Sequence, residues 1–230
     1  GTYQATTVYM GSNASIDASA TDNGNGGKIV LWSDIHNANS MTRAQGTVLA
    51  KGGAQGGNGG QIETSGHSID IDGFQVDTRS ASDVLGKTGL WLIDPYDYSI
   101  YSAQATTIGN ALNSSDVTIT TATSNPSYGA TGSGTGRITF WNGQTPITKT
   151  AAGTTTLTLK ADEGIWVASD IISTGGPLNV VLWSDNANAN LAGSNIQANI
   201  TTNGGHLWAG GSSSAGGSST WNGLTVGNGP

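Results

Sequence analysis

The sequence predicts an all-β protein folded as a parallel β-helix, a solenoid of stacked coils. Three observations predict this fold. Gly supplies 36 of the 230 residues, only 10% of residues are Asp, Glu, Lys or Arg, and short apolar runs recur between turn residues along the chain. An average soluble domain has roughly 25% charged residues. A Gly-rich, weakly charged chain with recurring apolar runs indicates stacked β-structure rather than disorder.

The predicted strands are short runs, apolar or alternating, that stop at Gly, Asn or Asp. In chain order they are IVLW (29–32), TVLA (47–50), IDID (69–72), VTITT (117–121), ITFW (138–141), LTLKA (157–161), IWVA (165–168), VVLW (180–183) and LTV (224–226). The one helical pattern, Thr106–Leu112, is short and is followed by Asn-Ser-Ser. Helix is therefore expected to be nearly absent.

An antiparallel sandwich is the competing architecture. Its hairpins would place two-residue turns between runs of similar length. The runs here are irregularly spaced, and glycines occur in longer strings such as GGAQGGNGG (52–60). A β-helix tolerates corner loops of varying length, and glycine suits corners that need a positive φ. At roughly 20 residues per coil, the chain predicts about eleven coils.

Internal repeats support the solenoid. LWSDIHNAN (31–39) recurs as LWSDNANAN (182–190), identical at seven of nine positions. A Gly-Gly-x-(Ile/Leu) step recurs at Gly26–Ile29, Gly59–Ile62, Gly175–Leu178 and Gly204–Leu207. Both features return in the same order, which indicates a duplication. The chain is therefore divided into a first β-helical segment (1–87), a junction motif (88–101) and a second segment (102–230) that continues the first.

The junction motif (88–101), which begins TGLWLIDPYDYSI (88–100), is unlike the rest of the chain because two carboxylates flank a proline among aromatic residues. Asp94 and Asp97 resemble an acid/base pair for glycoside hydrolysis. The favoured interpretation is an Asx-type turn of Asp94 with Pro95 at a coil corner. Pro95 cannot donate to a strand ladder. Trp91, Asp94 and Pro95 are thus predicted to form a structural joint where the chain leaves the stack.

Alternation within the motif predicts which side chains face the core. Leu90, Leu92 and Ile100 are expected on the inward face of the strand, with Trp91 and Ile93 on the opposite face. The tyrosines that follow are expected to cover the exposed edge of the coil.

Charge and composition exclude several classes of protein. The net charge is −7, and the Lys and Arg residues stand singly. Nucleic-acid binding requires a basic stripe that displaces counterions, and anionic membranes attract basic clusters, so neither partner is expected. No apolar run approaches the roughly 18 residues that span a bilayer. The absence of cysteine excludes disulfides and thiolate metal sites.

No motif for catalysis, metal or cofactor binding is found. His36, His67 and His206 lie in separate turns without the spacing of a zinc site. Neither a Gly-x-Ser-x-Gly elbow nor a phosphate-binding lysine motif occurs. The chain is therefore expected to be non-enzymatic and to bind no cofactor.

Tryptophans and sequons are the remaining surface candidates. Trp141 and Trp221, each in a Trp-Asn-Gly turn, are candidates for glycan contact. Core packing or coil-to-coil stacking is expected for the tryptophans inside apolar runs, namely Trp32, Trp166, Trp183 and Trp208. Asn13, Asn113 and Asn199 begin Asn-x-Ser/Thr sequons and are candidate glycosylation sites.

Several segments resemble the filamentous-haemagglutinin-type adhesins that Gram-negative bacteria secrete by the two-partner route. These are GGKIVLWSD (26–34), GNGGQIETSG (57–66), TGLWLIDPYDYSI (88–100), LTLKADEGIWVASDIISTGGPLNVVLWSD (157–185) and ITTNGGHLWAGG (200–211). The resemblance implies a right-handed parallel β-helix with a role in adhesion, filament formation or display of a distal tip. The family's Asn-Pro-Asn-Gly-type secretion domain is not present, so a passenger segment is expected.

The expected function follows from the resemblance. The chain would be a shaft or adhesive segment of a large secreted or cell-surface protein. Its partners would be a receptor or glycan on a host or neighbouring cell, other copies in a filament, and an outer-membrane transporter during export. Two alternatives stay open: a β-helical polysaccharide-active enzyme, which needs acidic residues of successive coils along a groove, and the shaft of a contact-dependent toxin.

Overall fold

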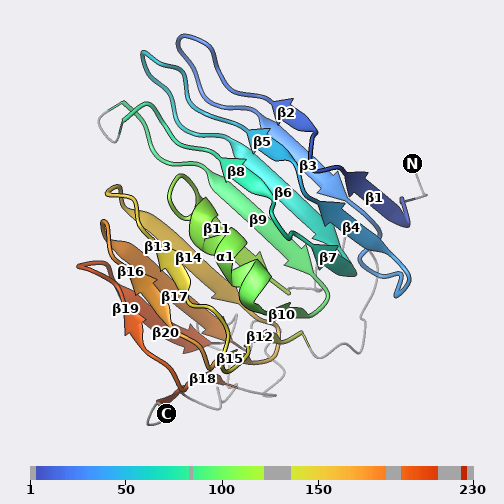
Figure 1. Ribbon diagram of the computed structural model, residues 1–230, viewed down its shortest axis with the longest axis vertical. Helices are drawn as coiled ribbons and strands as arrows, with labels where there is room; N and C mark the ends of the chain where they lie inside the picture. Colours follow the sequence, from blue (N-terminus) through green and yellow to red (C-terminus); the bar gives the residue numbers. More distant parts are fainter. Residues whose placement is uncertain (1–3, 83–84, 122–135, 185–192, 212–223, 227–230) are drawn as a thin grey trace, which may run out of the picture.

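The computed structural model describes residues 4–82, 85–121, 136–184, 193–211 and 224–226. Successive coils lie side by side from the N-terminal to the C-terminal end, and each adds strands to the sheets of the coil before it (Figure 1). All the described pairings between named strands are parallel. The prediction of an all-β parallel β-helix is confirmed.

One sheet, here called the long sheet, runs through the whole stack. Its seven strands are β3 (Lys28–Trp32), β6 (Gln61–Gly66), β9 (Leu90–Pro95), β11 (Asp116–Thr120), β14 (Thr155–Lys160), β17 (Leu178–Ser184) and β20 (Leu207–Gly211). Ile62 packs inward and is fully buried. Residues that pair in register across successive strands are here called a register column. The column of Ile62 continues through Trp91 and Val117, so apolar side chains stack directly over one another from coil to coil.

The other faces are made of shorter sheets. In the N-terminal half they are β1 (Thr7–Met10), β4 (Met41–Ala44) and β7 (Ser68–Asp70), and β2 (Ser15–Asp17), β5 (Thr47–Leu49) and β8 (Gln75–Asp77). In the C-terminal half they are β10 (Tyr98–Ile100), β12 (Ile138–Phe140), β15 (Ile165–Val167), β18 (Ser194–Ile196) and β21 (Leu224–Val226), and β13 (Ile147–Lys149), β16 (Ile171–Ser173) and β19 (Ile200–Thr201).

The coils are longer than the sequence predicted. Between register partners of the long sheet, one coil takes 23 residues at the shortest (Leu157 to Val180) and 40 at the longest (Val117 to Leu157). The expectation of roughly 20 residues per coil and about eleven coils was wrong, because the corner loops take up more of the chain. The described part of the long sheet has seven strands.

The repeated sequence occupies equivalent positions in two coils. Leu31 in β3 and Leu182 in β17 lie in the same register column of the long sheet. Trp32 and Trp183 follow them, each with its side chain half-buried. The second half of the later repeat, residues 185–190, lies outside the described residues.

Glycines of the Gly-Gly steps allow the backbones of successive coils to approach closely. A Cβ on Gly60 would lie 2.0 Å from the carbonyl oxygen of Gly27. Gly89, the single glycine at the equivalent position of the next coil, behaves alike, since its Cβ would lie 2.1 Å from the carbonyl oxygen of Gly60. Neither Gly60 nor Gly89 has a positive φ. Close approach, rather than the positive φ expected from the sequence, is what requires glycine at these positions.

A Gly60→Ala variant is expected to unfold with a free energy about 1–3 kcal/mol lower than the wild type, the usual cost of overpacking. The added methyl group meets backbone, which cannot rotate away as a side chain can. Gly153→Ala is the matched control, because a Cβ there has nothing within 4 Å. Urea denaturation of both variants measures the difference, and equal stabilities would refute the argument.

A helix replaces a strand in the fourth coil. Helix α1 (Ser102–Ala111) lies between β8 and β13 (Figure 1). Helix is scarce in the described residues, as predicted, but the expectation that Thr106–Leu112 is too short to matter was wrong, because these residues belong largely to α1. Ala105 and Ile108 are buried, and a Cβ on Gly109 would lie 2.7 Å from the backbone of Thr148, so the helix packs tightly against β13. The described residues contain no helix that is both long and apolar enough to cross a membrane.

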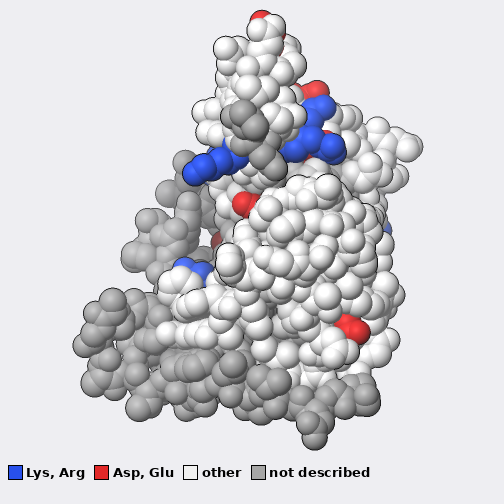
Figure 2. All heavy atoms as spheres, turned by 90° about the vertical axis from the view of Figure 1, so that its left-hand side faces the viewer, with Lys and Arg blue, Asp and Glu red and all other residues white. Residues whose placement is uncertain are grey.

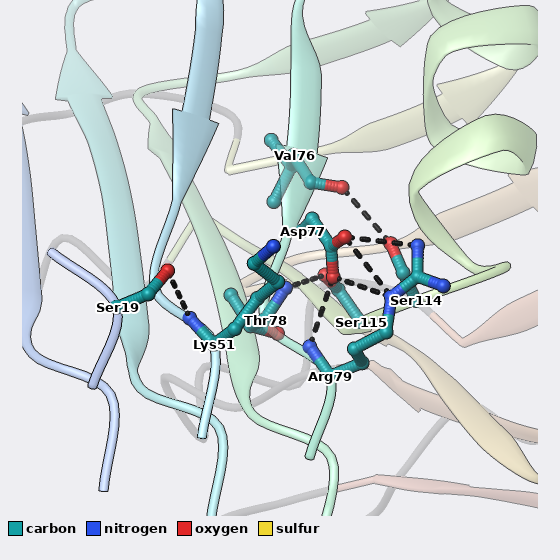
Figure 3. Close-up of polar contacts among 8 residues, drawn as sticks. All are labelled: Ser19, Lys51, Val76, Asp77, Thr78, Arg79, Ser114 and Ser115. Atoms are coloured by element: carbon teal, nitrogen blue, oxygen red, sulfur yellow. Dashed lines mark hydrogen bonds and ion pairs between the residues drawn. The ribbon is translucent and has the colours of Figure 1, made fainter. Parts of the chain in front are cut away.

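The segment after α1 is tied to the end of β8 by side-chain hydrogen bonds (Figure 3). The Ser114 hydroxyl donates to the carbonyl oxygen of Val76 at 3.0 Å, and Ser115 Oγ accepts from the backbone N–H of Thr78 at 3.1 Å. These bonds occupy polar groups that a neighbouring strand would otherwise satisfy. The stack therefore continues across the helix.

The short sheets of the N-terminal half do not continue into those of the C-terminal half, whereas the long sheet does. β7 does not pair with β10, and α1 separates β8 from β13, whereas the long sheet passes through β9 without interruption. The predicted junction motif (88–101) lies between the last strands of the N-terminal sheets, β7 and β8, and the start of helix α1. The division of the chain into segments 1–87 and 102–230 stays a prediction.

Within the junction motif, the predicted faces of β9 were wrong. Trp91 and Ile93 are fully buried, whereas Leu90 and Leu92 are half-buried on the outer side. Ile100 faces inward as predicted. All four residues from Leu90 to Ile93 are apolar, so alternation alone does not fix which set faces the core.

Candidate ligand-binding face

A row of three aromatic side chains lies across the sheet that contains β10, β12 and β15. Tyr101, Trp141 and Trp166 are 49%, 39% and 39% exposed. The ring centroids of Tyr101 and Trp141 are 6.4 Å apart with their planes 8° from parallel, and those of Trp141 and Trp166 are 5.8 Å apart and tilted by 54°. These three residues are called the aromatic row.

The geometry of the row leaves much of its ring surface uncovered. Parallel carbon atoms in contact lie roughly 3.5–4 Å apart. The centroids of Tyr101 and Trp141 are 6.4 Å apart. If the two ring planes are in contact, the rings are displaced sideways, parallel to their planes, by about 5 Å. Neither ring covers the face of the other, so the pair forms a stepped aromatic surface.

Strand register explains why these residues meet. Ile100 in β10 pairs with Phe140 in β12, so the residues that follow them, Tyr101 and Trp141, lie next to each other. Trp166 points outward because its neighbours in β15, Ile165 and Val167, point into the core.

The predicted exposure of Trp141 is confirmed. Trp166 and Trp208 are 39% and 48% exposed, so of the two alternatives expected for them, core packing does not hold. Trp166 instead contacts the ring of Trp141 in the preceding coil. Coil-to-coil stacking is observed between Trp183 and Trp208, whose centroids are 5.7 Å apart. Trp221, the other predicted glycan contact, lies outside the described residues.

A groove of about 470 Å³ runs beside the aromatic row. Its lining includes Trp141, Trp166, Thr139, Arg137 and Asn195. The Oδ1 atom of Asn195 is buried and accepts no hydrogen bond among the described residues. An orphaned buried acceptor is unusual in a folded protein, and it leaves this groove with an unmet requirement for a donor.

Charges at the groove largely compensate one another. Arg137 Nε donates to Glu163 Oε1 at 2.9 Å, and the backbone N–H of Arg137 donates to Asp97 Oδ1 at 2.8 Å. The guanidinium is thus held in an ion pair rather than presented alone. Asp97 thereby anchors the strand of the next coil.

Asp94 occupies a different environment from Asp97. Burial, together with the nearby carboxylates of Glu63 and Asp162, raises the pKa of Asp94 to about 7. Its Oδ1 atom is buried without a hydrogen-bond partner among the described residues. The predicted Asx-type turn at Asp94 was wrong, since no such bond forms there. Pro95, as predicted, ends its strand, but only after pairing in register with Gly66.

A larger cavity, of about 700 Å³, lies between β8 and α1. Phe74 and Val76 line it and are themselves almost fully buried, while Asp77 and Arg79 at its edge are ion-paired at 2.8 Å (Figure 3). This space results from packing a helix where neighbouring coils place strands. It presents no exposed aromatic ring and no orphaned polar atom comparable to those of the groove.

The histidines are not brought together. His67 stacks on Tyr96 at a centroid distance of 4.7 Å, while His36 and His206 belong to other turns. Within the described ranges, no three His, Asp or Glu side chains are grouped as metal ligands.

The three sequons differ in accessibility. Asn13 is exposed in the turn between β1 and β2. Asn199 is exposed, but its side-chain nitrogen donates to Asp170 at 3.3 Å. Asn113 is partly buried, and its Oδ1 accepts from the backbone N–H groups of Thr150 and Ala151, both at 2.8 Å. Glycosylation stays a prediction, and Asn13 is the most accessible of the three.

Comparison with known proteins adds no relative. No protein-family model matches the chain, and no curated protein matches it.

Proposed function

We propose that the chain is a shaft segment of a large secreted bacterial surface protein of the filamentous-haemagglutinin type, which mediates attachment or filament formation. The segments that resemble this family, from 26–34 to 200–211, support the proposal, as does the stacking of the described residues into parallel coils. The mostly uncharged surface visible in Figure 2 suits a structure that meets other surfaces rather than a charged ligand.

The main observation in support of the proposal is that apolar side chains are exposed at both ends of the stack. Ile16 lies in the same register column as the buried Val48, yet it is 38% exposed. Leu207 lies in the column of the buried Val180 and is 49% exposed. At both ends, the apolar columns of the described residues stop in exposed side chains on strands that pair with no further described strand, a form suited to continuation by further coils. A shaft has this geometry, whereas a closed globular enzyme covers its core on all sides.

The proposed setting is the outside of a Gram-negative bacterium, reached through an outer-membrane transporter. The proposed partners are a receptor or glycan on a host or neighbouring cell, and other copies of the protein in filaments. The shaft of a contact-dependent toxin would use the same coils.

A polysaccharide-active enzyme remains the second candidate, and one observation favours it. Asp94 has a raised pKa beside Glu63 and Asp162, and perturbed carboxyls close together are typical of glycoside hydrolysis. We nevertheless propose a non-enzymatic role, because the exposed aromatic row lies on a different sheet from Asp94 and Glu63.

The proposal is tested by attachment and turnover measured together. Beads that carry the 230-residue chain are expected to attach to epithelial or bacterial cells more strongly than beads that carry the Ile62→Asp variant, in which a buried charge disrupts the core. Release of reducing sugars from a panel of polysaccharides is expected to stay at background. Absence of both attachment and self-association in sedimentation would refute the shaft proposal. Sugar release abolished by Asp94→Asn would establish the enzyme instead.

A further inference from the structure

We infer that the aromatic row and its groove form a binding site for a neutral oligosaccharide. Pyranose rings combine apolar C–H faces with a rim of hydroxyl groups. A ligand of this kind needs flat aromatic surface and hydrogen-bonding groups in one place. The inference deepens the proposed attachment role and rests on it for its biological setting, but the binding site is argued from its own geometry.

The aromatic row supplies the flat surface. Tyr101, Trp141 and Trp166 come from three successive coils, and strands in a sheet are spaced by about 4.8 Å. The row therefore spans about 10 Å along the stack, which suits an extended disaccharide unit lying across the strands. Because the rings of Tyr101 and Trp141 are offset, each offers a face to a different sugar ring.

The groove supplies the hydrogen bonds. Its volume of about 470 Å³ lies within the roughly 300–1,000 Å³ of ordinary ligand pockets. The outward hydroxyls of Ser99 and Thr139 line it, and these groups can both donate and accept. The unpartnered Oδ1 of Asn195 requires a donor. Sugar hydroxyls can pair with Ser99 and Thr139, and a change of the Asn195 rotamer would bring its buried Oδ1 to the same ligand; an apolar ligand can make neither contact.

Charge selects a neutral saccharide. Arg137 is held by Glu163 and Asp97 lies beside it, so the groove offers no uncompensated cation to a sulfated or sialylated glycan. The same lack of an unpaired cation disfavours single-stranded nucleic acid, which also stacks on aromatic rings but depends on basic residues along its backbone. The net charge of −7 acts in the same direction.

The test is calorimetric titration of the full 230-residue chain with soluble hexasaccharides. The neutral probes are β-1,4-linked glucose, β-1,4-linked N-acetylglucosamine and α-1,6-linked mannose, and a heparin hexasaccharide is the anionic comparison. At least one neutral probe is expected to bind with a dissociation constant in the micromolar to low millimolar range, and more tightly than heparin. No binding by any neutral probe, or tightest binding by heparin, would overturn the inference.

Variants locate the site. Trp166→Ala and Trp141→Ala are each expected to weaken binding about tenfold or more, since stacking surface is lost. Trp208→Ala is the matched control: it removes a somewhat more exposed tryptophan from the long sheet, outside the groove, and should change affinity less than twofold. Circular dichroism verifies that each variant is folded. An equal loss in Trp208→Ala and Trp166→Ala would assign the binding to another surface.

Attachment of cells separates this inference from the proposed function. Oligosaccharide binding without cell attachment would keep the site and refute the attachment role. Attachment that persists in Trp166→Ala, without oligosaccharide binding, would refute the site and keep the shaft. Attachment that Trp166→Ala abolishes, but that survives periodate oxidation of the cell-surface glycans, would overturn the saccharide in favour of a protein partner.

Discussion

Replacing Trp91 with alanine is expected to lower the free energy of unfolding by about 3–5 kcal/mol, the usual cost of removing a large buried aromatic side chain. The Trp91 side chain is fully buried in the register column between Ile62 and Val117. Its ring meets that of Phe74 edge-on at 5.6 Å, and its Nε1 donates to Thr64 Oγ1 at 3.2 Å. Truncation would leave a cavity at the point where, among the described sheets, the long sheet alone holds strands of both halves.

Chemical denaturation monitored by far-UV circular dichroism measures this loss. Trp91→Phe is expected to cost less, because it retains most of the apolar volume but loses the hydrogen bond to Thr64. Trp208→Ala removes a half-exposed ring that contacts Trp183, and should cost less, about 0.5–1.5 kcal/mol. A loss in Trp91→Ala no greater than in Trp208→Ala would contradict the structure.

An Asp94→Asn variant is expected to be more stable than the wild type above neutral pH and equally stable near pH 4. The folded-state pKa of Asp94 is raised to about 7 from an ordinary value of 3.8. Between these two values the folded protein retains a proton that the unfolded chain has lost. The stability of the wild type therefore falls as the pH rises through this range, and it levels off above about pH 7.

The size of this effect follows from the shift of about three pKa units. Each unit corresponds to about 1.4 kcal/mol, so the gain in Asp94→Asn reaches at most about 4 kcal/mol at pH 8. Asparagine is neutral at every pH and avoids the repulsion from Glu63 and Asp162. Denaturation curves recorded from pH 4 to pH 8 measure the difference. The free energy of unfolding of Glu63→Gln should vary less between pH 4 and pH 8 than that of the wild type. An Asp94→Asn variant that is less stable than the wild type at pH 8, or whose difference from the wild type does not change with pH, would contradict this account.

The sequence was sufficient to predict the class of fold because its signals are local. Alternation around Ile62 and the Gly-Gly steps depend only on near neighbours along the chain. The prediction of which side chains of Leu90–Ile93 face the core was wrong because all four residues are apolar, so their sequence does not distinguish the inner face from the outer. Register with β6 and β11 decides the question, and register is a property of the stack.

The aromatic row was beyond prediction for a related reason. Tyr101, Trp141 and Trp166 meet only because the coils between them have particular lengths, and corner loops vary too widely for these lengths to be deduced. One signal was present, however. Ile165 and Val167 flank Trp166, and strict alternation places the ring on the outer face. Helix α1 likewise depends on its packing against β13, which its weakly amphipathic sequence does not reveal.

The parallel pairing of the strands has a consequence for how the protein reaches its native state. Every described pairing between strands joins residues at least 23 positions apart, the shortest being that of β14 with β17. No hairpin can form early, so contact order is high and spontaneous folding is expected to be slow. A coil already formed offers a strand edge as a template for the next. A chain that emerges from one end through a narrow channel would thus fold vectorially, coil upon coil, and each added coil would oppose its backward movement.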